Sequence, residues 1–290
     1  MGKFKDYLNE KGYRNTTVTG CTKEAEFFIE WAEQENIHPE KCIYNELLSY
    51  VKSCTEKGNS KRTINHKLNS LTHYFDYLIA IKARQENPAT ELRIKNDIRK
   101  VPHDLLSKEA LEKIYKDYPA NGITGKRNKA MLGLMIYQGA TTAELPQIEV
   151  KDIKLEEGKV YIPGSARSNS RLLKLEAMQI IQLQNYLLTI RPVLIAMTEK
   201  QTDKLFMSSG KSSRLSNSFA KLMVIITKLN NKVTDTKQIR ASVITEWLKV
   251  HNIRQVQYMT GHRYVSSTVH YRTDKLEGLQ EQLENLHPLK

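Results

Sequence analysis

The C-terminal part of the chain carries a tyrosine at a set distance from a Gly-His pair. Tyr271 follows His262 by nine residues, and Gly261 directly precedes that histidine. Upstream, Lys237 and Arg240 are three residues apart, so they share one face if the segment is helical. These residue types, in this order, could act together in a chemical reaction.

These side chains suit an attack on a phosphodiester. A tyrosine hydroxyl has an ordinary pKa of about 10, so it needs a base or cationic surroundings to act as a nucleophile near neutral pH. An arginine offers a planar, always charged fork to the negative charge that gathers on phosphate oxygens. A lysine or a histidine can give a proton to the leaving oxygen. We therefore predict Tyr271 as the nucleophile and Arg240, His262 and Lys237 as its catalytic partners. The alternative is that Lys237 and Arg240 are surface residues and that His262 is structural.

An earlier segment completes the pattern. Residues 139–145 read GATTAEL, and this set, followed by the basic pair, the Gly-His and the tyrosine, resembles the tyrosine recombinase (phage-integrase) superfamily, including its Xer-like site-specific recombinases. That family has Gly-x-Arg-x-x-Glu-Leu in this box. Gly139, Glu144 and Leu145 match it, whereas Thr141 stands at the arginine position. Thr141 can offer a neutral hydrogen bond to a phosphate but no charge.

The family also places a lysine on a β-hairpin after this box. Here Ser165 and Ala166 stand in that place, with Arg167 and Arg171 close by. Either arginine is a candidate substitute that contacts a phosphate, but neither is a good acid, because guanidinium keeps its proton in proteins.

The resemblance implies a function as well as a fold. It implies a DNA-binding site-specific recombinase or integrase of a mobile element, which cuts and rejoins double-stranded DNA through a 3′-phosphotyrosine intermediate with no cofactor and no metal. It also implies a homo- or hetero-tetramer on DNA, with or without a second recombinase. Two alternatives remain open: a degenerate relative that binds DNA and acts with a partner recombinase, and a helical regulator without catalysis.

Composition agrees with an anionic partner. The chain has 290 residues, 45 Lys and Arg against 32 Asp and Glu, and a formal net charge of +13. Such a balance favours nucleic acid first and a membrane surface second. No apolar run approaches the roughly 18 residues of a membrane span, so we expect no membrane partner. The three cysteines lack metal-ligand spacing, and we expect small core residues of a cytoplasmic protein.

The elements that must position these residues are mainly helical. Apolar residues recur at helical spacing in 17–35, 43–56 and 60–79, which predicts a helical N-terminal domain over residues 1–87; the resemblance makes it a core-binding (SAM-like) domain that clamps DNA. Residues 88–104 are polar and basic, and we expect a linker. The predicted DNA-binding residues lie at the start of the third helix and in this linker: Lys61, Arg62, His66, Lys67, Arg99 and Lys100. The alternative for each is an ordinary solvated face.

The second domain, residues 105–290, is predicted to be mixed α/β with a small β-hairpin. Strands are expected at 160–163 and 172–175, joined by a polar turn. A long helix is expected over 176–195, ended by breaking residues near Arg191 and Pro192, followed by helices at about 216–229, 236–249, 253–259 and 267–272. A last helix, 275–285, would carry an apolar stripe: Leu276, Leu279, Leu283 and Leu286. The fold class is therefore mainly α with a small sheet.

Overall fold

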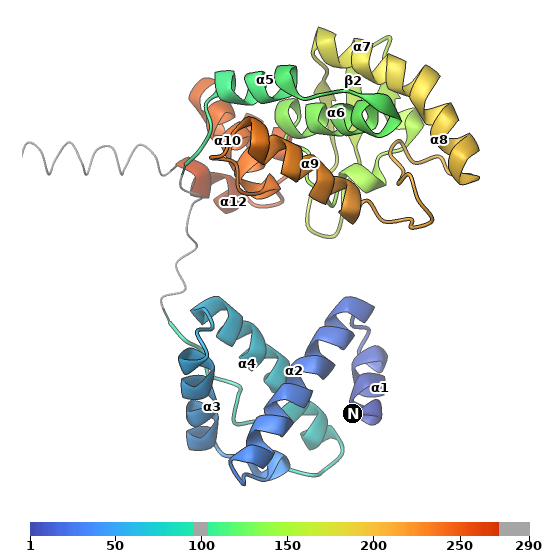
Figure 1. Cartoon of the computed structure of the whole chain (residues 1–290). Helices are drawn as coiled ribbons and strands as arrows, with labels where there is room; N and C mark the ends of the chain where they lie inside the picture. Colours follow the sequence, from blue (N-terminus) through green and yellow to red (C-terminus); the bar gives the residue numbers. More distant parts are fainter. Residues whose placement is uncertain (96–103, 273–290) are drawn as a thin grey trace, which may run out of the picture. The chain divides into compact units, whose positions relative to one another are not determined.

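The computed structural model describes residues 1–95 and 104–272. The chain divides into two compact units, Met1–Arg99 and Lys100–Lys290. Each unit has its own buried hydrophobic core. Figure 1 shows the first unit in blue and teal and the second in green through red. The prediction of a mainly helical protein with one small sheet is confirmed.

The N-terminal unit is a helical bundle. Its third long helix begins where predicted, because the Ser60 side chain accepts a hydrogen bond from the Thr63 amide at 3.1 Å and so satisfies a free helix N-terminus. Phe28 lies in the centre, edge-on to Tyr50 and Phe75 with ring centroids 5.3 and 5.8 Å away. The elements are α1 (Gly2–Glu10), α2 (Asn15–Gln34), the 3-10 turn η1 (Pro39–Lys41), α3 (Tyr44–Glu56) and α4 (Lys61–Ala80).

This unit extends beyond the predicted boundary at residue 87. Ala89 is 2% exposed and belongs to the same core. The Asn65 side chain exchanges two hydrogen bonds with the Ile94 backbone, at 2.9 and 3.0 Å. Residues 88–95 therefore pack on the bundle, held by the core contacts of Ala89 and by the Asn65 side chain on α4, which binds the Ile94 backbone. The predicted linker is shortened by these residues.

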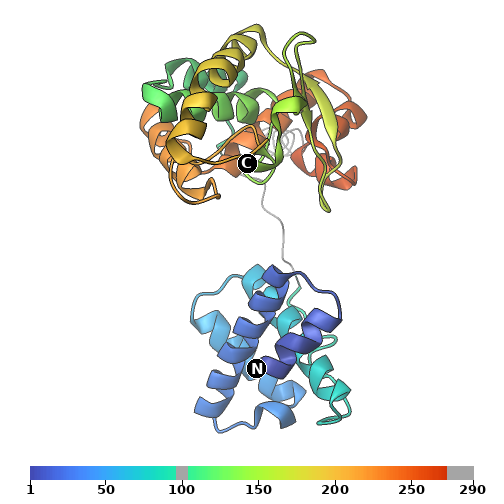
Figure 2. The same ribbon diagram turned by 90° about the vertical axis from the view of Figure 1, so that its right-hand side faces the viewer.

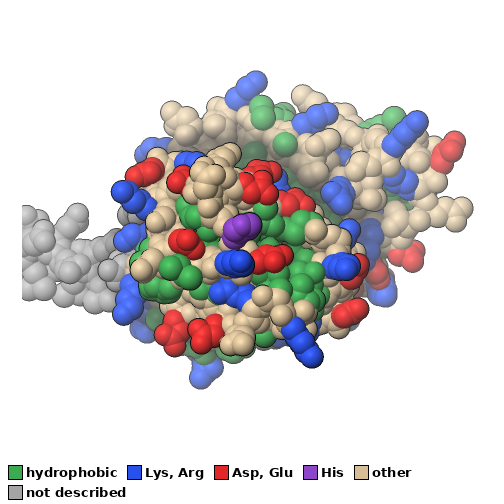
Figure 3. All heavy atoms as spheres, turned by 90° about the horizontal axis from the view of Figure 1, so that it is seen from below, with side chains coloured by type: hydrophobic (Ala, Val, Ile, Leu, Met, Phe, Trp, Pro, Cys, Tyr) green, Lys and Arg blue, Asp and Glu red, His purple; other side chains and the backbone are tan. Residues whose placement is uncertain are grey.

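The charges of the N-terminal unit are mixed on the face that points downward in Figure 1. In Figure 3, this face carries Lys and Arg side chains interspersed with Asp and Glu, together with hydrophobic side chains. It is not a patch of one sign, so it is not the face that the excess of basic residues would favour for an anionic partner.

The second unit begins with two helices and a small sheet. Ser107 caps α5 (Lys108–Asp117) by accepting from the Ala110 amide at 3.3 Å. The apolar α6 (Gly122–Tyr137) is buried along most of its length. Three antiparallel strands in the order β1-β2-β3 follow, with Ile162 opposite Arg171 next to the turn that closes the hairpin. The strands are β1 (Ile153–Lys154), β2 (Lys159–Ile162) and β3 (Arg171–Lys174), preceded by the 3-10 turns η2 (Leu145–Gln147) and η3 (Val150–Asp152).

The helix after the sheet does not end at Pro192, contrary to the sequence prediction. It runs as α7 (Ala177–Asn185), a π-helical turn η4 (Tyr186–Ile190) and α8 (Arg191–Thr198). Pro192 lies in the first turn of α8, where a missing N–H is tolerated, and the left-handed Glu199 ends the helix instead. By length and composition alone, Ala177–Thr198 could cross a membrane, with a mean hydropathy of 1.2. One such helix is weak evidence of a membrane span, and 22% of its most apolar window is buried inside the structure. Its buried residues Leu183, Tyr186, Ile190 and Leu194 belong to the core of the second unit.

Four helical elements and a final turn carry the C-terminal motifs. They are α9 (Ser216–Leu229), α10 (Thr236–Val250), α11 (Ile253–Thr260), α12 (Ser266–Val269) and the 3-10 turn η5 (His270–Arg272). The orange and red helices lie beside the yellow-green strands in Figure 2, and α11 packs on β3. The predicted helix 275–285 lies outside the described residues.

Candidate active site around Tyr271

Tyr271 lies in η5, which packs against α10. Its ring is stacked on the His262 ring, with centroids 6.0 Å apart and planes 13° from parallel. The neighbouring His270 ring meets it edge-on at 5.9 Å. The tyrosine is half-buried, so its position is fixed by aromatic neighbours while part of its surface remains open to a substrate.

Gly261 explains how the Gly-His pair positions its histidine. It ends α11 in the left-handed conformation with φ of 71°, which glycine adopts without strain. A Cβ at this position would lie 2.7 Å from Arg171 Nη1 and 2.7 Å from the Asn169 carbonyl oxygen. The Asn169 amide also donates to the Gly261 carbonyl at 2.8 Å. Only glycine therefore lets α11 end against the hairpin.

His262 is oriented by a short polar contact. Its Nδ1 lies 2.9 Å from the Thr268 hydroxyl, and Thr268 is fully buried. Its backbone forms a β-bridge with Ser168 on the hairpin turn. The histidine thus joins three segments, namely the hairpin, the end of α11 and the turn that bears Tyr271.

Arg240 projects from α10 toward the same place. Its guanidinium donates to the backbone carbonyls of Gly139 and Thr260, the latter at 2.8 Å, and lies 3.8 Å from the Glu144 carboxylate. Burial lowers the pKa of Arg240, while Glu144 and Tyr271 raise it. An arginine in a protein still keeps its proton, so this is a fixed positive charge within electrostatic reach of the Tyr271 hydroxyl.

A buried ion pair lies beside Arg240. Arg171 has no exposed side-chain surface, and its two Nη atoms donate to the two Glu144 oxygens at 2.7 and 3.1 Å. Thr141 donates to the same carboxylate through its amide and its hydroxyl, each at 2.9 Å. Burial raises the pKa of Glu144, but the hydrogen bonds and charges of Arg171 and Arg240 outweigh it and hold that pKa below its usual value. Glu144 is therefore ionised and ties three segments together.

The hairpin cations differ in their positions. Arg167 is exposed in the turn between β2 and β3, where its backbone amide is held by the Ser165 hydroxyl at 3.1 Å. Arg171 is the first residue of β3 and points inward. The sequence made both candidate phosphate contacts, whereas in the structure the Arg171 guanidinium is bound to Glu144.

The remaining predicted residues differ in exposure and in ion pairing. Lys237 is exposed and has no ion pair among the described residues; it lies one helical turn before Arg240. Lys67 is paired with Glu24 at 2.6 Å and is only 14% exposed. At the start of α4, three other predicted contacts are exposed: Lys61, Arg62 and His66. Arg99 and Lys100 lie outside the described residues.

One positioning contact was missed by sequence reasoning. The Tyr258 hydroxyl donates to the Leu172 carbonyl at 3.3 Å and accepts from the Leu172 amide at 3.1 Å. It therefore fastens α11 to β3 and supports the placement of Gly261. Its signal in the sequence is a tyrosine three residues before the Gly-His, but 14 tyrosines in the chain make such a signal weak.

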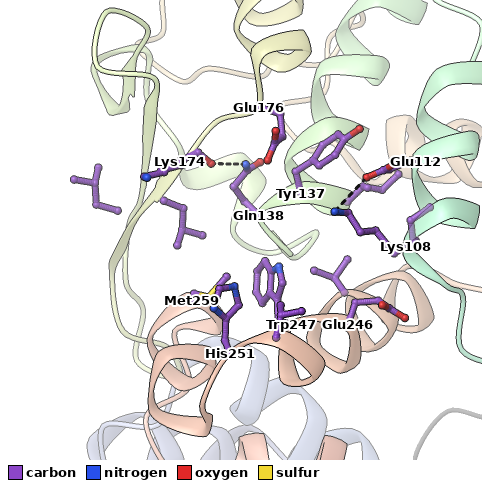
Figure 4. Close-up of a pocket in the computed structure, with 16 residues that line it drawn as sticks. Lys108, Glu112, Tyr137, Gln138, Lys174, Glu176, Glu246, Trp247, His251 and Met259 are labelled. Carbon is purple, nitrogen blue, oxygen red and sulfur yellow. Dashed lines mark hydrogen bonds and ion pairs between the residues drawn. The ribbon is translucent and has the colours of Figure 1, made fainter.

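A separate cavity of about 580 Å³ is lined by residues of α5, the end of α6, β3, α10 and α11. Figure 4 shows Trp247 and Met259 on its apolar floor. The rim carries the Lys108–Glu112 ion pair, with 3.8 Å between Nζ and Oε1, and Gln138, which donates to the Lys174 carbonyl at 2.8 Å. No group of three or more His, Cys, Asp or Glu residues suited to a metal occurs in residues 1–95 and 104–272.

Known proteins resemble both parts of the chain. Residues 104–277 match the phage integrase family model and residues 2–82 match the phage integrase N-terminal SAM-like domain. Tyrosine recombinase XerC of Bacillus pumilus (strain SAFR-032) is 25% identical over 293 residues, covering 98% of this chain and 95% of the relative. Tyrosine recombinase XerD of Oceanobacillus iheyensis is 23% identical over 284 residues, covering 96% and 94%.

Solved structures share the fold. The Tn1549 transposon integrase in complex with transposon right end DNA matches with a TM-score of 0.69 and 14% identity over 98% of each chain. The XerH site-specific recombinase bound to a palindromic difH substrate matches with a TM-score of 0.69 and 19% identity, covering 91% of this chain and 78% of that one. The predicted family and the SAM-like N-terminal domain are confirmed, and the chain belongs to the phage integrase family of tyrosine recombinases.

Proposed function

We propose that this protein is a site-specific DNA recombinase and that Tyr271 is its nucleophile. The observation that carries the proposal is the convergence of Tyr271, His262 and Arg240 from η5, the end of α11 and α10. In the step proposed, the tyrosine oxygen bonds to phosphorus as the bond from phosphorus to the 5′-oxygen breaks. The tyrosine gives up its proton to solvent, and the 5′-oxygen gains one from the Lys237 ammonium.

The roles follow from the chemistry of each group. Arg240 meets the charge on the phosphate oxygens, because its guanidinium is permanently charged. His262 orients the tyrosine ring. Lys237 shares a helical face with Arg240 and, as an ammonium, can give its proton to the leaving oxygen where a guanidinium cannot. Arg167 on the exposed turn is the proposed substitute cation, and Arg171 supports Glu144 rather than the phosphate.

The proposed substrate is double-stranded DNA. The relatives whose structures were solved with DNA support this, as does the formal net charge of +13. We assign phosphate contacts in the N-terminal unit to the exposed start of α4, which carries Lys61, Arg62 and His66. The unit that makes them is taken to end at about residue 95 rather than 87, since residues 88–95 pack on it. Free buried cysteines support a reducing cytoplasm.

Assembly on DNA is proposed to be tetrameric, with either four copies or two copies of each of two recombinases. The resemblance implies that the segment after the tyrosine docks on a subunit. That segment lies outside the described residues, but its leucines at 276, 279, 283 and 286 have helical spacing. The cavity of Figure 4 offers an apolar floor close to α10, on which the described chain ends. We assign the neighbouring subunit's leucines to it.

Covalent trapping tests the proposed nucleophile. A nicked suicide substrate that contains the native site should give a protein–DNA adduct with the wild type and none with Tyr271→Phe, while DNA binding stays intact. Tyr264→Phe is the matched control, because Tyr264 is 71% exposed in the same segment, and it should form adduct normally. Equal adduct with Tyr271→Phe would remove Tyr271 as nucleophile. Absence of adduct from every variant despite specific binding would favour a degenerate, binding-only relative.

A further inference from the structure

A second cavity of the C-terminal unit has the chemistry of an anion site. Its volume is about 410 Å³, and it lies between the start of α6, the loop before α9 and α9 itself. Its lining includes Arg127, Arg214 and Lys221, and no aspartate or glutamate lines it in the described part of the chain. None of the elements that line it carries Tyr271, His262 or Arg240, so the catalytic proposal does not account for it.

The charge of Arg127 is the unusual feature of this cavity. Arg127 is only 2% exposed. Its Nε and Nη2 donate to the Asn128 side-chain oxygen at 3.1 and 2.8 Å, and its Nη1 donates to the Met207 carbonyl at 2.9 Å. Both acceptors are neutral oxygens, and no carboxylate pairs with this guanidinium among the described residues. A buried charge without a counter-charge is costly, and burial accordingly lowers the pKa of Arg127.

The guanidinium also has capacity for a ligand. Three of its five N–H groups are used by these contacts, which leaves two. Tyr118 brings a second buried polar group: it is 1% exposed and lines the cavity, and although Asn128 lies close to it, its hydroxyl meets no partner with hydrogen-bond geometry in the described residues. An anion with several acceptor oxygens would satisfy both.

The walls of the cavity are built to hold such an anion. Arg214 and Lys221 are exposed and have no ion pair among the described residues. The loop between α8 and α9, visible beside α9 in Figure 1, is fixed by Lys200, whose Nζ donates to the Ser208 hydroxyl and the Ser212 carbonyl, both at 2.7 Å. The loop is thus tied down by a cation instead of being free to close over Arg127.

We propose that this cavity binds a phosphate group, with Arg127 at its base and Arg214 and Lys221 at its mouth. The phosphate belongs either to the DNA backbone or to a free phosphate-bearing molecule. In both cases, a dianionic or monoanionic tetrahedral group supplies the counter-charge that Arg127 lacks, and its oxygens accept from the guanidinium and from the two exposed cations.

The key variant is Asn128→Asp, because it supplies the missing carboxylate to Arg127 at the same side-chain size. It should raise the midpoint of thermal unfolding while weakening binding of inorganic phosphate at least about tenfold, as measured by titration calorimetry at constant ionic strength. Lys221→Gln should weaken phosphate binding without affecting Arg127. Lys228→Gln is the matched control on the same helix, since Lys228 is exposed and outside the cavity lining, and it should bind phosphate as the wild type does.

DNA binding distinguishes the two sources. If the phosphate belongs to DNA, Lys221→Gln should reduce the slope of log affinity against log salt concentration by about 0.9, and Asn128→Asp should reduce it too. If phosphate binding is lost in these variants while the DNA slope equals that of the wild type, the ligand is a free molecule. No saturable phosphate binding by the wild type, or equal binding by Asn128→Asp, would overturn the site. Failure of Tyr271 to form an adduct would not affect it.

Discussion

Replacing Thr141 by arginine tests whether a second guanidinium in the proposed active site would speed the reaction. Thr141 is half-buried, and its amide and hydroxyl both donate to Glu144 Oε2 at 2.9 Å. The Arg171 fork takes the two oxygens of the same carboxylate. A carboxylate has about four acceptor positions, so Glu144 is saturated. Arg240 is then the guanidinium whose charge reaches Tyr271.

The size of the effect follows from this arrangement. Thr141→Arg keeps the backbone amide bond to Glu144 but loses the hydroxyl bond, which costs up to about 1.5–3 kcal/mol of folding stability. The half-exposed position gives the longer side chain a route to a bound phosphate. One preorganised donor aimed at developing charge is worth about 10²–10³ in rate. We expect Thr141→Arg to speed covalent adduct formation by up to that factor.

The assay is the single-turnover rate of adduct formation on a nicked substrate, with DNA saturating. Thr141→Val removes the hydroxyl without adding charge and should be no faster than the wild type. Thr141→Lys adds charge without a fork and should fall between the wild type and Thr141→Arg. If Thr141→Arg folds, binds the site and cleaves at the wild-type rate, a cation already fills this place, and the reasoning is refuted.

The remaining predictions concern the scaffold and the assembly. Glu144→Gln should lower the free energy of unfolding by about 3–5 kcal/mol in urea melts, because it leaves Arg171 buried without a counter-charge; Glu149→Gln, at a more exposed carboxylate, should cost far less. Because folding lowers the pKa of Glu144, its contribution is present above the unfolded pKa and is lost as pH falls through the folded one. Gly261→Ala should destabilise and reduce cleavage together, since its Cβ would meet Arg171 and the Asn169 carbonyl at 2.7 Å; retention of both properties would contradict the packing argument. DNA affinity should fall about 10³–10⁵-fold between 50 and 200 mM salt if roughly 6–10 phosphates are contacted, and a flat response would exclude a DNA clamp. Deletion of residues 274–290 should impair synapsis more than binding by single subunits, as compared by gel shift; full recombination by the deleted protein would refute subunit docking.

Most helices could be predicted from the sequence because their signals are local. Apolar residues at helical spacing and the cap Ser60 fix the start of α4 within one residue of the predicted one. The short elements α1 and β1 were not predicted, since nine and two residues carry too little periodicity. The helix through Pro192 was predicted to break there because a proline interrupts an α-helical ladder. In the structure, the π-helical turn η4 lies just before Pro192, and the helix continues through the proline. Such a turn depends on tertiary packing, which the sequence does not show.

The candidate site was only partly accessible to sequence reasoning, for a similar reason. Tyr271, His262 and Arg240 come from two segments with motif spacing, so their proximity could be anticipated. The Glu144–Arg171 pair spans 27 positions and depends on the register of the hairpin. An arginine at the end of a polar turn has the same sequence signal whether it points to solvent or into the core. The sequence did not predict the burial of Arg127 either. This arginine stands among other basic residues near the start of an apolar helix, where an exposed side chain is expected.

The position of the Glu144–Arg171 pair explains how the site can lack an arginine at 141 and still be built. The pair fastens the GATTAEL segment to β3, and Gly261 then packs directly on Arg171. None of these contacts requires a positive charge at position 141, because the Thr141 amide and hydroxyl satisfy the remaining acceptor positions of Glu144. In the proposed reaction, the lack of an arginine at position 141 therefore weakens the stabilisation of the transition state and leaves intact the architecture that holds Tyr271, His262 and Arg240 together. We therefore expect DNA binding and cleavage rate to be separable properties of this chain. A cation delivered to the exposed side of Thr141, from its own hairpin or from a neighbouring subunit of the proposed assembly, should raise the cleavage rate without changing DNA binding.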